Sequence, residues 1–291
     1  MTTGFLFCHD PLRAARTDPQ FAQEAELVRE SGGTVALVDH DALLAGDPSG
    51  AVRRVPRDSG AYWYRGWMVP ADAYAALERA LAARGCSLRT GAAAYRRAHE
   101  LPGWYGRFDT LTPRSVWRAG AEGAADPDGL AALAAPLGAG PGIVKDYVKS
   151  RKHEWDEACF VPELSDRARL SAVVRRFVEL QLGDGALAGG IVLRAYEAFV
   201  PGGEARAWWV DGEPVLVTAH PDTPEQLPGT KLDGPLREAV RGLGCPWVTT
   251  DLALRADGVW RVVEVGDGQV SGLPRGADWS ALCAALLRNG G

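Results

Sequence analysis

The feature that most constrains the fold is a pair of apolar segments near the carboxyl end of the chain. Residues 248–254 contain Asp251, and residues 260–265 contain Glu264. The dipeptide Asp257-Gly258 lies between the two segments, and Asp-Gly between two apolar runs is a strong hairpin signal. The sequence therefore predicts two adjacent β-strands, each carrying one acid among apolar neighbours.

A buried carboxylate is unfavourable unless it is paired, hydrogen-bonded or bound to a metal. Two close carboxylates also repel each other unless a cation lies between them. Asp267 and Gln269 follow the second strand in a glycine-rich loop. We therefore predict a Mg²⁺ site with Asp251, Glu264 and Asp267 as oxygen ligands, of the kind that binds Mg²⁺ together with substrate phosphates. The alternative is one exposed acid and one acid in a salt bridge.

The composition is that of an ordinary globular protein of two or three lobes, with 291 residues, 46% of them hydrophobic and 24% charged. No apolar run approaches the roughly 18 residues of a membrane span, and the start of the chain does not resemble a signal peptide. The net charge of −5 argues against a general nucleic-acid binder. Five scattered cysteines without a C-x-x-C pair indicate reduced thiols. We expect a cytoplasmic protein without a membrane or nucleic-acid partner.

The first hundred residues alternate between strand and helix signals, which is typical of a small parallel sheet flanked by helices. The expected strands are 5–8, 34–38 and 61–65, and the expected helices are 19–29 and 71–84.

The remaining two thirds of the chain has the pattern of antiparallel sheets. The expected helices are 130–137 and 171–182, and the expected strands are 143–149, 191–200, 204–210 and 213–218, with turns at 201–203 and 211–212. Gly138, Gly140 and Gly142 precede a strand, whereas a phosphate-binding fingerprint would follow one and open a helix, so we interpret them as a loop. The predicted domains are 1–105, 106–195 and 196–291.

A second cluster of chemistry-bearing residues surrounds Lys145, which lies inside an apolar strand where a cation needs an anionic partner. The basic segment 149–152 (Lys-Ser-Arg-Lys) follows in an expected loop. Ammonium, guanidinium and backbone N–H groups there could bind phosphate oxygens. A solvated basic turn is the alternative for Arg151 and Lys152.

A third cluster comprises two arginines and two acids where a hinge between lobes could lie: Arg194, Glu197, Glu204 and Arg206. Acids at a hinge can accept hydrogen bonds from a ribose or an amino group, and an arginine beside them can reach a phosphate. Cross-strand ion pairing is the alternative, and it stabilises sheets by only about 0.2–1 kcal/mol. Arg65, between aromatic residues, could hold a substrate carboxylate, although an aromatic interface between lobes is an equal alternative.

Taken in order, these clusters resemble the ATP-grasp superfamily over nearly the whole chain. The phrases that carry the resemblance are Tyr-Arg-Gly-Trp at 64–67, Val-Lys-Asp-Tyr-Val-Lys-Ser at 144–150 and Val-Glu-Val-Gly-Asp-Gly-Gln at 263–269. They look like a divergent bacterial and phage clade of that superfamily. The implied fold is α/β (α+β): a small parallel α/β amino domain followed by two α+β lobes with antiparallel sheets.

The resemblance also implies roles for individual residues. Lys145 corresponds to a lysine that contacts ATP phosphates, and 149–152 to the lid over them, with Lys149, Ser150 and Lys152 as ligands. Glu197 lies where adenine binds, Glu204 where ribose is held, and Arg194 beside them; Arg206 and Lys149 would neutralise charge during the reaction. The family lysine expected before the central lobe is missing, and Arg107 or Arg118 could replace it. Position 266 is Gly where an Asn is common.

The implied activity is ATP- and Mg²⁺-dependent ligation of a small-molecule or peptide carboxylate to an amine through an acyl-phosphate. An ATP-dependent small-molecule kinase and a non-catalytic nucleotide-binding module are the alternatives. The sequence names neither substrate, and it leaves the oligomeric state open, a homodimer included.

Overall fold

The computed structural model describes residues 3–185, 187–220, 229, 232, 234–274 and 277–288. The chain forms two compact units. Unit 1 consists of Met1–Ala98, Gly202–Leu252 and Glu264–Gly291, and unit 2 consists of His99–Pro201 and Ala253–Val263. Each unit is described by itself, and the division of the chain into three lobes stays a prediction.

The amino-terminal part of unit 1 contains the expected parallel sheet, with β1 at its centre and antiparallel β2 paired to one end of β1. Leu6 of β1 pairs with Ala36 on one side and with Tyr64 on the other. Apolar side chains on both faces of the sheet are buried, as expected for parallel strands covered by helices. The strands are β1 (Gly4–Asp10), β2 (Arg13–Thr17), β3 (Thr34–Val38), β4 (Gly60–Arg65) and β5 (Cys86–Leu88).

The helices of this region begin at side-chain caps where the sequence offers an aspartate. Asp39 accepts a hydrogen bond from the Ala42 backbone N–H at the start of α2, and Asp47 caps α3 in the same way. The helices are α1 (Ala22–Glu30), α2 (His40–Leu44), α3 (Pro48–Ala51), α4 (Ala71–Ala82) and α5 (Ala92–His99). The predicted strands and helices of this region are confirmed.

Unit 1 also contains most of a second sheet, with strand order β11-β10-β12-β13. Asp211 and Gly212, with φ of 48° and 77°, form the tight turn between β10 and β11. The strands are β10 (Phe199–Val210), β11 (Glu213–Ala219), β12 (Trp247–Arg255) and β13 (Trp260–Asp267), and the helices are α9 (Gly234–Leu243) and α10 (Ser280–Arg288). The predicted acid-bearing hairpin is β12–β13.

A shared core joins the two sheets of unit 1. Phe5 and Trp63 of the first sheet pack in one cluster with Trp208 and Trp247 of the second and with Trp279. Trp63 and Trp247 meet edge to face, with ring centroids 5.9 Å apart. The amino-terminal sheet and the carboxyl-terminal strands of unit 1 are therefore one packed body.

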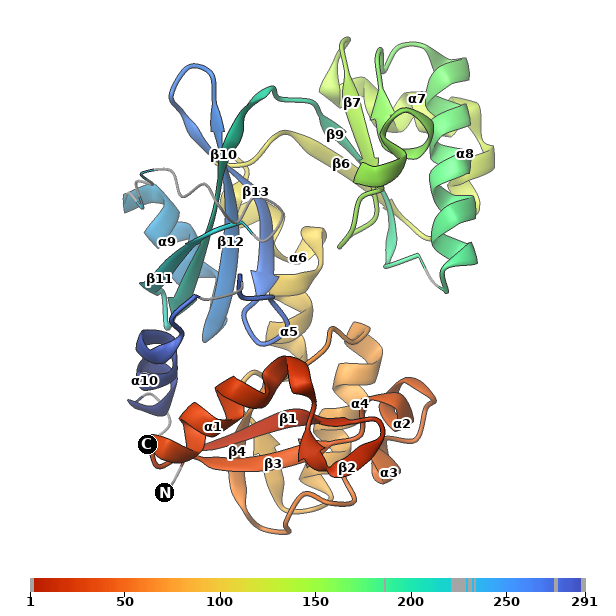
Figure 1. Cartoon of the computed structure of the whole chain (residues 1–291). Coiled ribbons are helices and arrows are strands. Elements are labelled where there is room, and N and C mark those ends of the chain that lie inside the picture. The colour runs from red at the N-terminus through yellow and green to blue at the C-terminus, as the bar shows by residue number, and fades with distance from the viewer. Residues whose placement is uncertain are drawn as a thin grey trace. The chain divides into compact units, whose positions relative to one another are not determined.

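Unit 2 is built on an antiparallel sheet of order β6-β9-β7-β8. Figure 1 shows α7 and α8 together on one side of this sheet, where Leu130, Phe177 and Leu193 are fully buried. The strands are β6 (Ser115–Ala119), β7 (Gly142–Lys145), β8 (Phe160–Val161) and β9 (Gly190–Ala195), and the helices are α6 (Leu101–Phe108), α7 (Pro127–Ala134) and α8 (Arg167–Gly183).

Three details of the predicted strands are wrong. The strand expected at 143–149 ends at Lys145, because the Asp146 carboxylate accepts backbone hydrogen bonds from Val148 and Lys149 and folds the chain into a turn. The strand expected to reach residue 200 ends at Ala195, and residues 201–203, expected to form a turn, lie inside β10. The chain passes from one sheet to the other here, so β9 and β10 do not form a hairpin.

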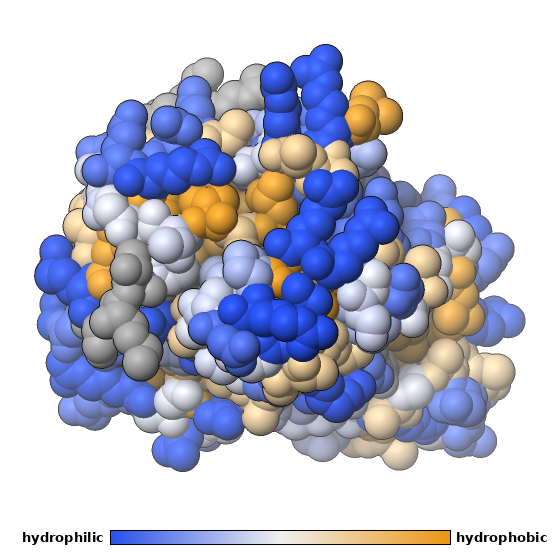
Figure 2. All heavy atoms as spheres, turned by 90° about the horizontal axis from the view of Figure 1, so that it is seen from below, coloured by the Kyte–Doolittle hydropathy of each residue, from blue (hydrophilic) through white to orange (hydrophobic). Residues whose placement is uncertain are grey.

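The surface carries few apolar side chains on the face that Figure 2 draws, where the apolar residues form small, separate patches. In the described part of the chain, no helix has the length and apolar character needed to span a membrane.

Candidate functional site

One face of the second sheet in unit 1 collects most of the predicted metal and phosphate ligands. Side chains alternate between the two faces of a strand, so Thr249 and Asp251 of β12 share a face, as do Glu264 and Gly266 of β13. A Cβ at Gly266 would lie 2.9 Å from Thr249 Oγ1, so the two pairs are on the same side of the sheet. This acid face brings Asp251 and Glu264 together as the sequence predicts.

Arg206 occupies the two oxygens of Asp251. Its Nε donates to Oδ1 at 2.6 Å and its Nη2 donates to Oδ2 at 2.8 Å, with both side chains largely buried. Burial raises the pKa of Asp251, but the bonds and charge of Arg206, with His220, outweigh it and lower that pKa to about 2. Arg206 also donates to the carbonyl of Gly272. The Arg206–Asp251 pair is thus a charged, bidentate contact formed without any ligand.

His220 is a member of this cluster that sequence reasoning missed. Its Nδ1 lies 3.5 Å from Glu204 and its Nε2 lies 3.4 Å from Asp251, so the ring stands between two carboxylates. His220 is 8% exposed. No spacing motif marks it, because it follows β11 and meets Asp251 only through the pairing of strands. The one available signal was its alternation with Thr218 at the end of a predicted strand.

Glu264 and Asp267 differ in their surroundings. Glu264 is partly exposed, and its carboxylate makes no ion pair or hydrogen bond with another residue of the described chain. Asp267 is fully buried, its Oδ1 accepts from the Gln269 backbone N–H and amide, and its Oδ2 has no partner among the residues that the structure describes. Burial raises the pKa of Asp267 to about 7, against the opposing effect of these bonds.

The three predicted metal ligands do not form a preassembled metal site. Among the described residues, no three His, Cys, Asp or Glu side chains are arranged to hold a metal ion. Asp267 is three residues from Glu264 on the same strand, so alternation directs it to the opposite face. The fit to Mg²⁺ is therefore good for Glu264, requires release of Arg206 for Asp251, and is poor for Asp267.

A second candidate region, the loop after β7, lies in unit 2 and is organised by Asp146. The Asp146 carboxylate accepts from the backbone N–H groups of Val148 at 2.7 Å, Lys149 at 2.5 Å and Ala188 at 3.2 Å. It also accepts from the Gln181 amide at 2.6 Å. The sequence marks Lys145 and Lys149, but not the buried acid that shapes the loop between them.

The predicted lysines take different positions around this loop. Lys145 is 5% exposed and donates from Nζ to the carbonyl of Val148, whereas Lys149 and Lys152 are exposed. Burial, together with the positive charges of Lys149 and Lys145, lowers the pKa of the buried His99 to about 4. A field strong enough to oppose protonation of a histidine is also one that attracts phosphate.

A cavity of about 250 Å³ adjoins the loop. It is lined by Lys149, Ser150, Arg151, His153, Glu154, Gln181 and Asp184. Arg151 is held by Gln181 at 2.6 Å and by Asp184 at 2.6 Å. Lys149 and Ser150 therefore stand at one cavity, as the sequence predicts, while Arg151 is tied to α8 rather than solvated.

The predicted nucleotide contacts near the end of β9 are engaged in structural pairs. Arg194 is buried, donates to Ser115 Oγ and to the Val263 carbonyl, and lies over the Trp104 ring at 6.0 Å. Glu197 accepts from Arg261 at 3.0 Å on each oxygen and from Arg255 at 3.4 Å. The ion-pairing alternative therefore describes Glu197 well.

Arg107 lies exposed in the last turn of α6. An aromatic cluster that the sequence did not reveal lies elsewhere in unit 2. Trp155 and Phe160 stack at 5.2 Å, and Tyr196 meets Phe160 edge to face at 5.4 Å. Trp155 opens a five-residue π-helix, a rare element that is frequent at functional sites.

Arg65, predicted to bind a substrate carboxylate, is already bonded within unit 1. Its Nε and Nη2 donate to Glu24 at 2.6 and 2.8 Å, and its Nη1 donates to the carbonyls of Ser271 and Gln269. Arg65 is 2% exposed and lies over the Phe21 ring at 5.3 Å. It stabilises the contact between β4 and the loop after β13, and that loop also accepts the bond from Arg206.

Comparison with solved structures shows the same fold in several proteins. A RimK domain protein of the ATP-grasp type from Sphaerobacter thermophilus matches with a TM-score of 0.61 at 17% identity, covering 99% of this chain and 100% of that one. The D-cycloserine synthetase DcsG matches with a TM-score of 0.61 at 19% identity, covering 98% and 99%. The ATP-grasp ligase PsnB, solved with a minimal precursor, Mg and ADP, matches with a TM-score of 0.56 at 14% identity, covering 98% and 97%.

These identities establish the fold alone, and it is the fold predicted from the sequence. A search of the curated proteins found no match. A family model that describes an ATP-grasp domain, the third family of its clade, matches residues 136–286, which is more than half of the chain. The acid face, the lysine-bearing loop and the two antiparallel sheets all lie within or across that segment, and the chain belongs to this family of ATP-grasp domains.

Proposed function

We propose that this chain is an ATP- and Mg²⁺-dependent ligase that joins a carboxylate to an amine through an acyl-phosphate. Family membership supports ATP as the substrate. Two structural neighbours bear the names synthetase and ligase, and one was solved with Mg and ADP. The observation that carries the proposal is the acid face of unit 1, where Arg206, Asp251 and Glu264 meet on three neighbouring strands.

In unit 2, the loop after β7 is suited to the nucleotide phosphates. Asp146 fixes the backbone of the loop through four accepted hydrogen bonds, so the loop needs no reorganisation to hold its shape. Lys149 and Ser150 line the adjoining cavity, and Lys145 is buried where the loop begins. Lys149, Ser150 and Lys152 are proposed as phosphate ligands, with Lys145 as a buried positive charge.

In unit 1, Glu264 is proposed as the principal ligand of Mg²⁺. When bound, Mg²⁺ would neutralise the phosphate charge that develops during transfer. Asp251 is proposed as a second ligand once Arg206 exchanges its carboxylate for a phosphate oxygen, which the bidentate geometry of guanidinium also suits. Glu204 would then keep a partner in His220.

The proposed reaction has two steps. An oxygen of the acceptor carboxylate attacks the γ-phosphorus of ATP, the bond to the β-phosphate oxygen breaks, and ADP leaves. The amine then attacks the acyl carbon, inorganic phosphate leaves, and the amine gives up a proton to water. Lys149 and Arg206 would stabilise the negative charge on the transferred group, since phosphoryl transfer depends mainly on positioning and electrostatics.

The experiment combines ATP, Mg²⁺ and a mixture of amino acids and short peptides, with and without hydroxylamine. A ligase releases ADP and inorganic phosphate and forms a new amide, and hydroxylamine diverts the acyl-phosphate to a hydroxamate that mass spectrometry detects. A stable phosphorylated product that hydroxylamine leaves unchanged would establish the kinase alternative. Calorimetry with ATP–Mg²⁺ separates the third alternative, because no binding at all would exclude both enzymatic activities.

A further inference from the structure

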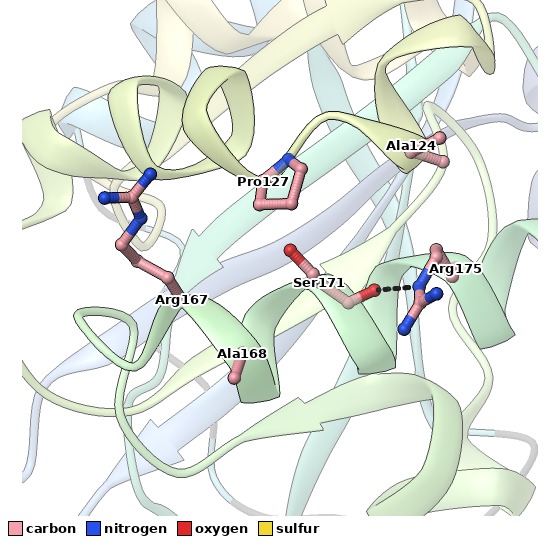
Figure 3. A pocket seen from close by; sticks show the side chains of 7 residues that line it. Ala124, Pro127, Arg167, Ala168, Ser171 and Arg175 are labelled. Atoms are coloured by element: carbon pink, nitrogen blue, oxygen red, sulfur yellow. Dashed lines mark hydrogen bonds between the residues drawn. The ribbon is translucent and has the colours of Figure 1, made fainter.

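A cavity of about 450 Å³ lies in unit 2 between the start of α7 and the amino-terminal half of α8 (Figure 3). Its walls are largely apolar, and it is lined by Ala124, Ala125, Pro127, Arg167, Ala168, Ser171 and Arg175. It shares no lining residue with the cavity beside the β7 loop. The proposed reaction uses none of these residues.

Ser171 is the polar group on the floor of this cavity. It is 6% exposed, and its hydroxyl oxygen has no hydrogen-bond partner in the part of the chain that the structure describes. Figure 3 shows the hydroxyl pointing from α8 toward Pro127 at the start of α7. A buried hydroxyl without a partner loses the free energy of a hydrogen bond, and a ligand with an oxygen acceptor at this position would restore it.

Two arginines flank Ser171 along the same face of α8. Arg167 precedes it by four residues and Arg175 follows it by four, a spacing that places all three side chains in one row. Both arginines are exposed at the rim, where Arg175 donates to a carbonyl of its own helix and Arg167 pairs with Asp128. The Asp128 pair is exposed on both sides, so it is weak and open to exchange.

We propose that this cavity binds a small organic anion, whose oxyanion head accepts from Ser171 Oγ and from the flanking arginines. The body of the ligand would lie against Ala124, Pro127 and Ala168, which supply apolar walls. The volume suits a carboxylate with a short aliphatic body. The anion replaces Asp128 as the partner of Arg167.

The test uses ¹³C-carboxyl-labelled hexanoate as the probe, with hexanamide as its neutral counterpart and inorganic phosphate as a head group without a body. Amide chemical shifts of the full-length protein locate the site, because binding here moves Ala168 and Ser171 whereas binding at the β7 loop moves Lys149. Hexanoate is expected to bind at α8, phosphate to bind there more weakly, and hexanamide not to bind.

Three variants then distinguish a built site from a chance contact. Ser171→Ala is expected to weaken hexanoate binding about tenfold, as for loss of a hydrogen bond to a charged group. Ala168→Leu fills the cavity from an exposed position and is expected to abolish binding. Asp128→Asn releases Arg167 and is expected to tighten binding up to about fivefold, the range of an exposed ion pair.

Circular dichroism and the unfolding midpoint confirm that each variant is folded, and Asp128→Asn keeps the test valid if Ser171→Ala destabilises the helix. Equal hexanoate affinity in the wild type, Ala168→Leu and Asp128→Asn would overturn the proposal. So would shifts confined to residues around Lys149, or equal binding of hexanamide.

Discussion

The two candidate regions use charge in opposite ways. On the acid face of unit 1, the predicted ligands Asp251 and Arg206 are buried and already bonded to each other. In the loop of unit 2, the predicted ligands Lys149 and Lys152 are exposed, and the buried charge, Asp146, shapes the backbone instead. The first arrangement must exchange partners to bind a ligand, whereas the second is ready to receive one. A residue of the first kind should affect stability and activity together, and a residue of the second kind should affect binding alone.

The largest effect is expected from breaking the buried pair of unit 1. Asp251→Ala leaves the Arg206 guanidinium buried without its carboxylate, so the free energy of unfolding should fall by about 3–5 kcal/mol. Denaturant titration measures it. The double variant Arg206→Met/Asp251→Leu should recover most of the loss, because an apolar pair carries no desolvation cost. A double variant as unstable as Asp251→Ala would show that the pair is not what matters.

A pH-dependent effect of similar origin is expected at Asp267. Its pKa is raised to about 7 in the folded protein, so its protonated form favours folding fully below pH ~4, the unfolded pKa. That contribution is lost as the pH rises to about 7. Asp267→Asn cannot ionise and should gain on the wild type across this window, by about 2–4 kcal/mol above pH 7, since one pKa unit corresponds to about 1.4 kcal/mol.

The difference between Asp267→Asn and the wild type is read from unfolding free energies at pH 4, 5.5, 7 and 8. Glu213→Gln serves as the control, because Glu213 is an exposed acid paired with Arg241 and Arg237. A constant difference across the whole pH range would show that Asp267 does not titrate in it.

In unit 2, the loop should depend on Asp146 for its shape. Asp146→Ala removes the acceptor of four hydrogen bonds and leaves buried backbone donors unsatisfied, so the free energy of unfolding should fall by about 2–3 kcal/mol. ATP affinity, measured by calorimetry, should fall with it. Loss of stability with unchanged ATP affinity would separate this loop from nucleotide binding.

The smallest effect on stability, and the sharpest contrast with Asp251, is expected at Lys149. Its side chain is exposed, so Lys149→Ala should change the free energy of unfolding by less than about 0.5 kcal/mol. ATP affinity should nevertheless fall about tenfold through loss of a charge-assisted phosphate contact. Arg107→Ala, in an exposed helical turn, tests whether any lost cation has the same result.

The sequence predicts the elements of this fold better than it predicts the partners of its charges. Strand periodicity and Asp-Gly turns identify the β12–β13 hairpin because both signals are local. The bonds of Arg206 and Arg65 are not local, since Asp251 and Glu24 lie 45 and 41 residues away along the chain. A charge inside a strand indicates that a partner exists, but only the pairing of strands shows which residue it is.

The strand boundaries that were wrong have a related cause. At Lys145 the apolar pattern continues to Val148, but the Asp146 side chain competes for the backbone N–H groups and ends the strand. At residues 201–203, Pro-Gly-Gly is typical of a turn, yet the chain stays extended because β10 pairs with strands of a different sheet from β9. His220 and the cluster of Trp155, Phe160 and Tyr196 carry no motif and were visible only in three dimensions.

The most direct test of the proposed ATP-grasp chemistry is Mg²⁺-dependent release of ADP by Glu264→Ala, with Glu213→Ala as a matched strand carboxylate. Glu264 is the acid of unit 1 that is partly exposed and not bonded to another described residue, so its loss should leave the unfolding midpoint unchanged. We predict that Glu264→Ala abolishes ADP release at every Mg²⁺ concentration while Glu213→Ala retains it. Wild-type ADP release by a folded Glu264→Ala variant would contradict the account and place the metal elsewhere.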